Sequence, residues 1–334
     1  MRIKNIKLNL VLAAGLVGIV GCGSPIENEK NVSNEGVSLT IEAFDNEGNG
    51  YEQIFETVPS RVITNNQSSL ELLLKLGLED HIIGTISLDD SLPEDLQESF
   101  DGIQVLTTTK SDPAKEVVIG NAPDLVIGRA ASFTDENFGT IESLNEVGAN
   151  VYVQLASQMN TEQSLDNILL DIQNVGKIFA KEEEATQLVN ELEQRLSTIE
   201  QTITTANRQP LNVMFMVNYA DGNYGVYGAN ASLQNDFLDR LNAVNVSQQG
   251  GQQSLENLMA LNPDVIIYVK ADKNSANDEV AIEALLNNEL IQSVTAIKNK
   301  AIFEVAYTEL MGYGYRTFDA LESLAQQMYP DLFE

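Results

Sequence analysis

The sequence is poor in the residue types that build redox and metal centres. Among 334 residues it has one cysteine, Cys22, one histidine, His81, and no tryptophan. A single cysteine excludes an internal disulfide framework, a zinc site built from cysteines and a CxxC redox motif. A single histidine argues against a site for bare zinc or manganese ions, because such sites usually need several imidazole ligands. We therefore expect no metal site, and we interpret His81, in "LEDHIIG", as a surface turn residue.

Basic residues are also scarce. The chain has 19 Lys and Arg against 49 Asp and Glu, which gives a formal net charge of −30. A surface this acidic repels nucleic acids and anionic lipid headgroups at long range, so we expect no nucleic-acid partner. The acidity itself does not identify a ligand, because it is common on exported proteins as a solubility feature.

The familiar catalytic motifs are missing as well. The sequence has no GxSxG elbow, Walker loop, GxGxxG or HExxH, and one histidine leaves few options for a general base. We therefore predict that the protein is not an enzyme and holds no cofactor. An exported α/β enzyme is the alternative, and turnover of a ligand would support it.

The first 21 residues have the pattern of an export signal. "MRIKNIK" carries three cations, and "LNLVLAAGLVGIVG" follows as an uncharged apolar run that is short for a membrane span. The run ends at Ile-Val-Gly-Cys, which looks like a bacterial lipobox. We predict a signal peptide at 1–21, a lipid on Cys22 and a flexible tether at 22–40. The alternative is a plain secretory signal with an incidental cysteine.

The remainder of the chain alternates strand and helix patterns. "PSRVITNN", "HIIGTI", "PDLVIG" and "ANVYVQ" predict strands, separated by helices, in an N-terminal lobe at 41–160. A second series of the same kind occupies 208–334. Alternating elements with continuous apolar strands indicate an α/β fold in which both lobes have mostly parallel sheets.

A helical segment at 161–207 joins the two lobes. It carries no strand signal, and its apolar residues recur at spacings of three and four, which is typical of one face of a long helix. These residues are Ala185, Leu188, Val189, Leu192, Leu196, Ile199 and Ile203. We predict one long interdomain helix that ends at "NRQP", residues 207–210.

One motif occurs in both lobes. "KEVVIGNAPDLVIG" at 115–128 and "LENLMALNPDVIIY" at 255–268 each predict a helix, a Pro-Asp turn and a buried strand. Glu116 and Glu256 occupy the same place in the two copies, seven residues before the proline. A favourable interaction of first-turn carboxylates with the helix dipole would explain both. Their duplication favours a shared role in two like contacts with one partner.

Taken in order, these segments resemble the substrate-binding lipoproteins of ABC importers for ferric siderophores, haem and vitamin B12. The resemblance rests on "VPSRVITNN…LELLLKLGLEDHIIG", both Pro-Asp segments, "GKIFAKEEEATQLVNELEQRL" and "YTELMGYGYRTFDALESLAQQMYP". It implies a class III periplasmic-binding-protein-like fold, with two lobes joined by one long helix. It also implies a monomer that its lipid holds on the outer side of the cell membrane, with Glu116 and Glu256 docking on an ABC permease dimer.

The resemblance places a ligand between the lobes, beyond the carboxyl ends of the strands. We predict that aromatic rings and guanidinium groups there bind a large, partly apolar chelate with exposed oxygens. Without tryptophan, tyrosines would form the aromatic wall. The predicted ligand-binding residues are Arg129, Ser132, Phe133, Tyr219, Tyr224, Tyr227, Tyr313, Tyr315 and Arg316.

The sequence leaves the ligand open. A ferric siderophore is favoured because it is the commonest cargo of the class, and haem and a corrinoid are the alternatives. A haem site with a histidine ligand is disfavoured, whereas a tyrosine or methionine ligand stays possible. A surface adhesion or scaffold lipoprotein without a small ligand is the alternative of another class.

Overall fold

Two sheets organise this computed structural model, which describes residues 38–107, 112–158, 162–228, 232–270 and 275–333. These residues belong to one unit, Val37–Glu334. The predicted signal peptide, Cys22 and most of the predicted tether lie outside the described residues. Within the described ranges, no helix has the length and apolar character needed to cross a membrane.

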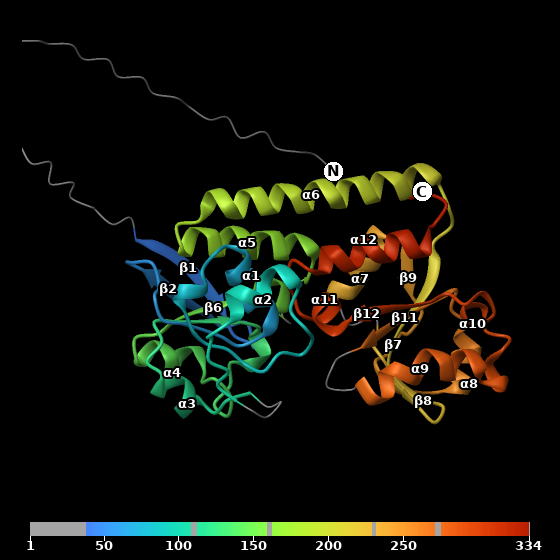
Figure 1. Cartoon of the computed structure of the whole chain (residues 1–334), viewed down its shortest axis with the longest axis horizontal. Helices are drawn as coiled ribbons and strands as arrows, with labels where there is room; N and C mark the ends of the chain where they lie inside the picture. Colours follow the sequence, from blue (N-terminus) through green and yellow to red (C-terminus); the bar gives the residue numbers. More distant parts are fainter. Residues whose placement is uncertain (1–37, 108–111, 159–161, 229–231, 271–274, 334) are drawn as a thin grey trace, which may run out of the picture. The chain divides into compact units, whose positions relative to one another are not determined.

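The described part of the N-terminal lobe contains a four-stranded sheet with short helices around it (Figure 1). The strands of this lobe, two of which lie outside that sheet, are β1 (Leu39–Phe44), β2 (Gly50–Phe55), β3 (Val62–Thr64), β4 (Ile82–Gly84), β5 (Leu125–Gly128) and β6 (Asn150–Val153). Its helices are α1 (Gln67–Lys75), η1 (Glu79–His81), α2 (Glu94–Phe100), α3 (Lys115–Gly120), η2 (Ala130–Ser132), α4 (Ile141–Glu146) and η3 (Leu155–Ser157).

The sheet of this lobe has the order β4-β3-β5-β6, and all of its pairs are parallel. Every residue of β3 and β5 is buried, as expected for parallel strands that are covered on both faces. His81 ends η1 immediately before β4, and its Nδ1 lies 2.6 Å from the carbonyl oxygen of Pro59. His81 therefore stands at a helix-to-strand connection, as a turn residue would, but it is half-buried and not fully at the surface.

Strands β1 and β2 form a separate antiparallel hairpin that the sequence patterns did not predict. Asp45 closes its turn, because Oδ1 accepts backbone N–H bonds from Glu47 and Asn49, both at 2.9 Å. The hairpin is attached to the sheet through Gln53, whose Oε1 accepts the N–H of Val151 in β6 at 2.7 Å.

The C-terminal lobe, as described, contains a six-stranded sheet. Its strands are β7 (Leu211–Ala220), β8 (Asn223–Val226), β9 (Ala243–Asn245), β10 (Gly251–Ser254), β11 (Val265–Lys270) and β12 (Ile302–Ala306). Its helices are α7 (Ser232–Arg240), α8 (Leu255–Leu261), α9 (Ser275–Asn287), η5 (Glu289–Ile291), α10 (Thr295–Asn299), α11 (Tyr307–Met311) and α12 (Thr317–Met328). Strands β9, β7, β11 and β12 pair in parallel, whereas β8 is antiparallel to both β7 and β10.

Two helices, α5 (Leu165–Ile178) and α6 (Glu182–Ala206), join the lobes and lie alongside each other (Figure 1). The buried residues of α6 are the seven apolar positions that the sequence predicted. The helix ends at Asn207, which adopts the left-handed conformation with φ 47°. Arg195 connects α6 to α12, because it donates to Asp319 at 2.7 Å and to Glu322 at 2.8 Å.

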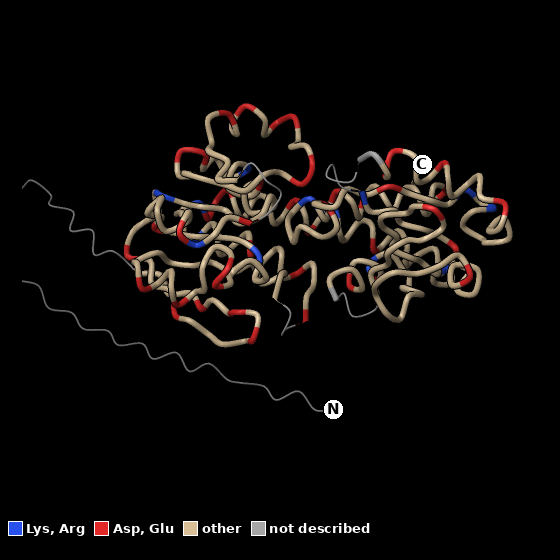
Figure 2. The backbone as a smooth tube through the Cα atoms, turned by 90° about the horizontal axis from the view of Figure 1, so that it is seen from below, with Lys and Arg blue, Asp and Glu red and all other residues tan. Residues whose placement is uncertain are grey.

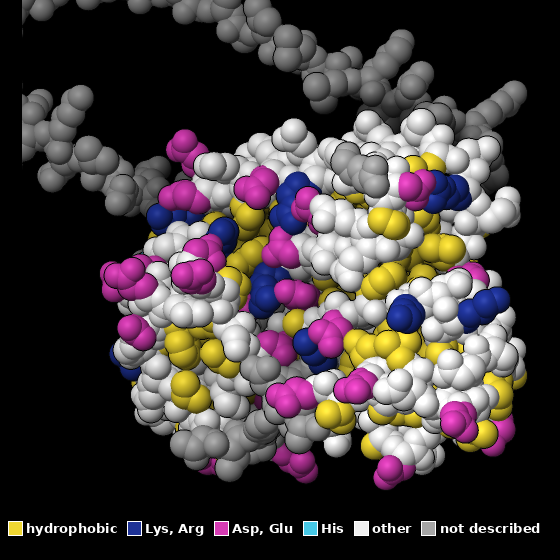
Figure 3. Space-filling view, turned by 45° about the vertical axis from the view of Figure 1, so that its right-hand side comes forward, with side chains coloured by type: hydrophobic (Ala, Val, Ile, Leu, Met, Phe, Trp, Pro, Cys, Tyr) yellow, Lys and Arg dark blue, Asp and Glu magenta, His cyan; other side chains and the backbone are white. Residues whose placement is uncertain are grey.

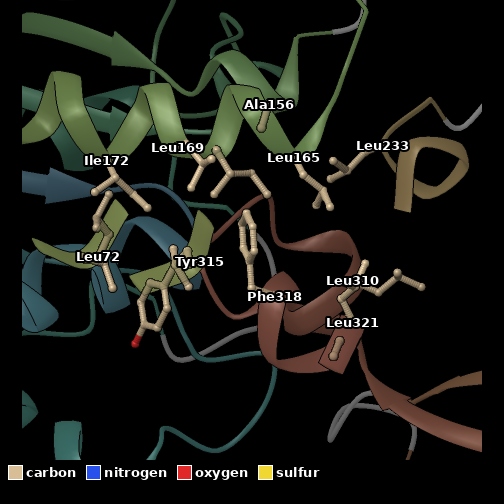
Figure 4. Close-up of a cluster of buried hydrophobic side chains, with 14 of the residues drawn as sticks. Leu72, Ala156, Leu165, Leu169, Ile172, Leu233, Leu310, Tyr315, Phe318 and Leu321 are labelled. Carbon is tan, nitrogen blue, oxygen red and sulfur yellow. The ribbon is translucent and has the colours of Figure 1, made fainter. Parts of the chain in front are cut away.

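One hydrophobic cluster is shared by the joining helices and both lobes. Figure 4 shows Leu72 of α1 and Ile172 of α5 on one side, with Phe318 of α12 pointing between the lobes' helices toward Leu169. The two lobes therefore share part of their hydrophobic core. Further clusters fill the outer part of each lobe.

Acidic residues are spread along the whole described chain and are not confined to one segment (Figure 2). On the face seen in Figure 3, several basic side chains lie next to acidic ones. Among the described residues, Arg240 pairs with Glu200 at 2.8 Å, Asp236 at 3.3 Å and Asp166 at 3.4 Å. Arg240, like Arg195, thus links separate helices of a chain that has a large excess of carboxylates.

Candidate ligand-binding site

The repeated sequence motif is a repeated structural unit. Strands β5 and β11 each pair in parallel with the first parallel strand of their lobe, β3 and β7. The residue before each Pro-Asp is left-handed, with φ 46° at Ala122 and φ 43° at Asn262. Asp124 accepts the N–H of Arg61 at 2.9 Å, and Asp264 accepts the N–H of Asn212 at 2.9 Å. In each lobe, this aspartate therefore fixes the start of the neighbouring strand.

Glu116 and Glu256 stand at matching places in these units. Each lies in the first turn of its helix, α3 or α8, and each is exposed. Ser254, the N-cap of α8, lowers the pKa of Glu256 through a side-chain hydrogen bond, and the backbone N–H of Glu256 adds to the effect. Both carboxylates are available to a partner.

The carboxyl ends of the N-terminal strands are built around Asn65. Its Oδ1 accepts the N–H of Arg129 at 2.7 Å, and its Nδ2 donates to the carbonyl of Arg129 at 3.1 Å. Gly128 is required next to it, because φ is 155° and a Cβ there would lie 1.8 Å from Asn65 Oδ1. Asn65 thereby sets the direction in which the chain leaves β5 and places Arg129.

Arg129 and Ser132 form a polar group with Asp112. Nε of Arg129 donates to Oγ of Ser132 at 3.0 Å, and that hydroxyl donates to Oδ2 of Asp112 at 2.8 Å. The guanidinium also lies 3.8 Å from the same carboxylate oxygen. The Arg129 side chain is 29% exposed, so it can also reach a ligand oxygen.

Three half-buried tyrosines of the C-terminal lobe lie near one another: Tyr227, Tyr307 and Tyr313. Burial raises the pKa of Tyr227, and the neighbouring hydroxyls of Tyr307 and Tyr313 raise it further. Burial also raises the pKa of Tyr313, whereas the positive charge of Arg129 lowers it. Arg129 of one lobe is thus within electrostatic range of a tyrosine of the other. We refer to Arg129, Tyr227, Tyr307 and Tyr313 as the tyrosine–arginine group.

The structure does not bring all of the predicted ligand residues to this group. Tyr219 and Tyr224 are 5% and 0% exposed and belong to the core of the C-terminal lobe. Both residues were expected beyond the carboxyl end of a strand, but β7 continues to Ala220 and the chain returns as β8, so both side chains lie on strands. The hydroxyl of Tyr224 donates to the carbonyl of Ser254 at 3.1 Å, and burial raises its pKa to about 12.

Phe133 and Tyr315 are also core residues, at 6% and 7% exposure. Phe133 packs in the outer cluster of the N-terminal lobe, and Tyr315 packs in the shared cluster (Figure 4). The predicted placement of these two aromatic rings toward a ligand is therefore corrected. Both rings pack in clusters of apolar residues that are distant in the sequence, which the position of a residue near a strand end does not reveal.

Arg316 makes a buried ion pair instead of facing open space. Its Nη1 donates to Oε1 of Glu71 at 3.0 Å, and its Nη2 donates to Oε1 of Glu309 at 2.6 Å. The side chain of Arg316 is 13% exposed and that of Glu71 is 2% exposed. Two carboxylates therefore compensate its charge within the protein, and Nη1 also donates to the Thr308 hydroxyl at 3.5 Å.

Tyr307 and Asp112 were missed by the sequence patterns. Tyr307 directly follows β12, so the strand-end argument that selected Arg129 could have found it. Asp112 has no such signal, because it does not follow a strand and its bond to Ser132 spans 20 positions of the chain. Among the described residues, no group of three or more His, Cys, Asp or Glu is arranged to hold a metal ion.

Two pockets on the described surface are lined by residues outside the tyrosine–arginine group. One of about 390 Å³ is lined by residues that include Glu200, Arg208 and Arg240. Another of about 540 Å³ is lined by residues that include Leu286 and Lys298. Because these pockets lie at helix ends away from the carboxyl ends of the strands, they do not compete with the junction of the lobes as the expected site.

The described chain thus has two α/β lobes, each with a copy of the same structural unit. Residues 62–307 match the model of the periplasmic binding protein family, and the chain belongs to that family. Its fold is class III periplasmic-binding-protein-like. A periplasmic binding protein from Veillonella parvula DSM 2008 has a TM-score of 0.78 and 25% identity, over 89% of this chain and 93% of that one.

Similar proteins also include substrate-binding proteins of ABC transporters. An uncharacterised ABC transporter substrate-binding lipoprotein of Bacillus subtilis, YvrC, is 24% identical over 97% of this chain and 96% of its own length. The petrobactin-binding protein YclQ of the same organism is 23% identical over 97% of both chains. The chain is therefore an ABC transporter substrate-binding protein of the siderophore, haem and cobalamin class, a class that binds its substrates without transforming them.

Proposed function

We propose that this protein is a lipid-anchored receptor, held outside the cell membrane, that captures a ferric siderophore and delivers it to an ABC permease. The observation that carries the proposal is the tyrosine–arginine group. In it, a partly exposed guanidinium of one lobe lies within electrostatic range of Tyr313 of the other lobe, whose half-buried ring has Tyr227 and Tyr307 as neighbours. A ferric chelate offers anionic oxygens to the former and flat or apolar surface to the latter.

The relatives support an iron chelate as the ligand. One is named a petrobactin-binding protein, and another, 25% identical over 90% of this chain, is named an iron-uptake system-binding protein. A cobalamin-binding protein of Halobacterium salinarum is 24% identical over 76% of this chain, and it keeps a corrinoid as the alternative. The polar contacts of Arg129 favour a ligand with exposed oxygens, which is why we place the siderophore first.

Delivery requires contact with the permease, and Glu116 and Glu256 are suited to it. They are exposed, they occupy equivalent places in the two lobes, and a two-fold permease presents two like surfaces. Carboxylates at both places can pair with basic residues of such a surface. We propose that one copy of this protein docks through both glutamates, and that Cys22 carries the lipid.

Thermal unfolding of the full-length chain tests the ligand. The melting temperature is measured with ferric hydroxamates, ferric catecholates, haem, cobalamin and free ferric ion, each at several concentrations. A ligand that binds only the folded state raises the melting temperature as its concentration exceeds the dissociation constant. A shift with a ferric hydroxamate or catecholate alone supports the proposal. A shift with haem or cobalamin alone, or with none, contradicts it.

A further inference from the structure

The segment 307–316 belongs to the C-terminal lobe by sequence, but its two ends are bound by carboxylates of the N-terminal lobe. At one end, Oδ2 of Asp90 accepts bonds from both the backbone N–H and the hydroxyl of Thr308, each at 2.8 Å. At the other end, Glu71 accepts the bond from Arg316 at 3.0 Å. No side chain of its own lobe caps α11, whose N-cap is Ala306. Asp90 therefore serves as the cap of this helix from across the lobe junction.

The middle of the segment is also fastened to the N-terminal lobe, through its backbone. The carbonyl of Gly312 accepts a bond from Nδ2 of Asn66 at 3.3 Å and another from the hydroxyl of Ser68. The carbonyl of Tyr313 accepts a bond from Nε2 of Gln154 at 3.2 Å. Tyr313 has φ 62°, which is unfavourable for a residue with a bulky side chain. These bonds help to keep it in that conformation.

Asp90 and Glu71 act through one polar network. Nε2 of Gln67 donates to Oε1 of Glu71 at 2.9 Å and to the carbonyl of Asp90 at 3.0 Å. Oε1 of the same amide accepts the N–H of Asp90 at 3.1 Å. Gln67, Glu71 and Asp90 are 1%, 1% and 8% exposed, so water does not compete strongly for these bonds. The network is rigid on the side of the N-terminal lobe and ends on the 307–316 segment.

We infer that Glu71 and Asp90 are positioning residues for the ligand site, because they hold the two ends of the segment that carries Tyr307 and Tyr313. Neither carboxylate belongs to the tyrosine–arginine group. Asp90 acts on it through the N–H and hydroxyl of Thr308, and Glu71 acts through the side chain of Arg316. The aromatic surface of the C-terminal lobe is thus placed by residues of the N-terminal lobe. The inference rests on the proposed function only in identifying Tyr307 and Tyr313 as ligand-facing.

Hydrogen exchange of the full-length chain, without ligand, tests the positioning. The variants are Asp90→Ala, which removes the cap, Asp90→Asn, which keeps an oxygen acceptor for Thr308, and Glu71→Gln, which removes the charge opposite Arg316. Asp278→Asn is the control, because Asp278 is 3% exposed and accepts the Tyr268 hydroxyl at 2.8 Å on the far side of the C-terminal lobe. Fluorotyrosine labelling gives a second readout, with the Tyr307 and Tyr313 resonances assigned from Tyr→Phe variants.

We expect Asp90→Ala and Glu71→Gln to raise exchange in residues 307–316 at least tenfold and to move the resonances of Tyr307 and Tyr313. Asp90→Asn should recover most of the native exchange, and Asp278→Asn should leave this segment unchanged. Unchanged exchange and resonances in Asp90→Ala and Glu71→Gln would overturn the inference. So would a rise of equal size in β11, because it would indicate general destabilisation. If Asp90→Ala does not fold, Glu71→Gln decides alone. No ligand is used, so a failed ligand screen and a failed positioning test are separate results.

Discussion

Ser68 and Gly314 come from different lobes and approach so closely that a Cβ on Gly314 would lie 2.5 Å from the Cβ of Ser68. Ser68 stands at the start of α1, and Gly314 stands between the two tyrosines of "YGY". The hydroxyl of Ser68 also donates to the carbonyl of Gly312. The lobes are in contact here through backbone that a larger residue would separate.

Gly314→Ala should therefore destabilise the chain by about 1–3 kcal/mol, the usual cost of a methyl group forced into a packed site. The measurement is the free energy of unfolding in urea. Gly120→Ala is the matched control, because nothing lies within 4 Å of a Cβ at that helical position. The control should be neutral or slightly more stable, since alanine is the better helix former. Equal values for the two variants would contradict the close contact.

Glu116→Ala together with Glu256→Ala should abolish uptake of the ligand by cells and leave its dissociation constant unchanged. The reason is that both carboxylates are exposed on α3 and α8, away from the tyrosine–arginine group. Uptake is measured with labelled ligand, and affinity is measured on the purified protein. The control pair is Glu142→Ala with Glu289→Ala, which removes an exposed first-turn carboxylate from each lobe. Loss of affinity in the first pair would refute docking as the role of these residues.

Arg129→Met should weaken ligand binding by about 10- to 100-fold, the range expected for one charge-assisted hydrogen bond. Tyr313→Phe should have a smaller effect, because it keeps the ring and removes only the hydroxyl. Tyr219→Phe is the control, since Tyr219 is a core residue and its hydroxyl accepts from Asn288 at 3.2 Å. Calorimetry with the chelate that raises the melting temperature measures all three. An unchanged dissociation constant in Arg129→Met would show that the guanidinium does not contact the ligand.

The stability of the protein should decrease as the pH rises toward 7 because of Asp171. This carboxyl accepts the Tyr152 hydroxyl at 2.7 Å and the N–H groups of Leu155 and Ala156 at 2.8 and 3.2 Å. Burial raises its pKa to about 7, although these hydrogen bonds lower it. A pKa that is raised above the unfolded value means that the folded chain holds the proton more tightly. The contribution of this proton is therefore complete below about pH 4 and lost as the pH passes 7.

The slope from one such group is at most about 1.4 kcal/mol per pH unit. It should be absent in Asp171→Asn and present in Asp278→Asn, when the free energy of unfolding is measured between pH 4 and pH 8. An unchanged slope in Asp171→Asn would show that other groups are responsible. Asp171 also holds the start of η3, next to Gln154, so the same variant should loosen the bond from Gln154 to Tyr313.

The sequence predicted the large elements well, for a physical reason. The apolar stripe of α6 and the repeated Pro-Asp unit are local patterns, and each is set by residues within one or two turns. The positions of the tyrosine side chains were harder to predict from the sequence. Tyr219 and Tyr224 lie on either side of a tight turn at Asp221 and Gly222, and strand alternation decides which face each takes. Because β7 extends through Tyr219 to Ala220 and β8 returns through Tyr224, both rings lie in the core.

Arg316 could not have been assigned from sequence, because Glu71 lies 245 positions away in the chain. Nothing local distinguishes an arginine that will meet a ligand from one that will meet a buried carboxylate. Tyr307 is the opposite case, since it follows β12 directly and the strand-end rule applied to it. Patterns thus selected candidate residues at strand ends, and long-range pairing determined which of them are already paired within the protein.

The hydrophobic cluster that runs through α5, α6 and α12 has a thermodynamic consequence. Since it includes buried residues of both lobes, neither lobe can melt without exposing part of the core of the other. Heating should therefore give a single cooperative transition in calorimetry, with equal calorimetric and van't Hoff enthalpies. Stabilisation gained by a small ligand at the junction would then be shared by residues far from it, including those at the tips of both lobes.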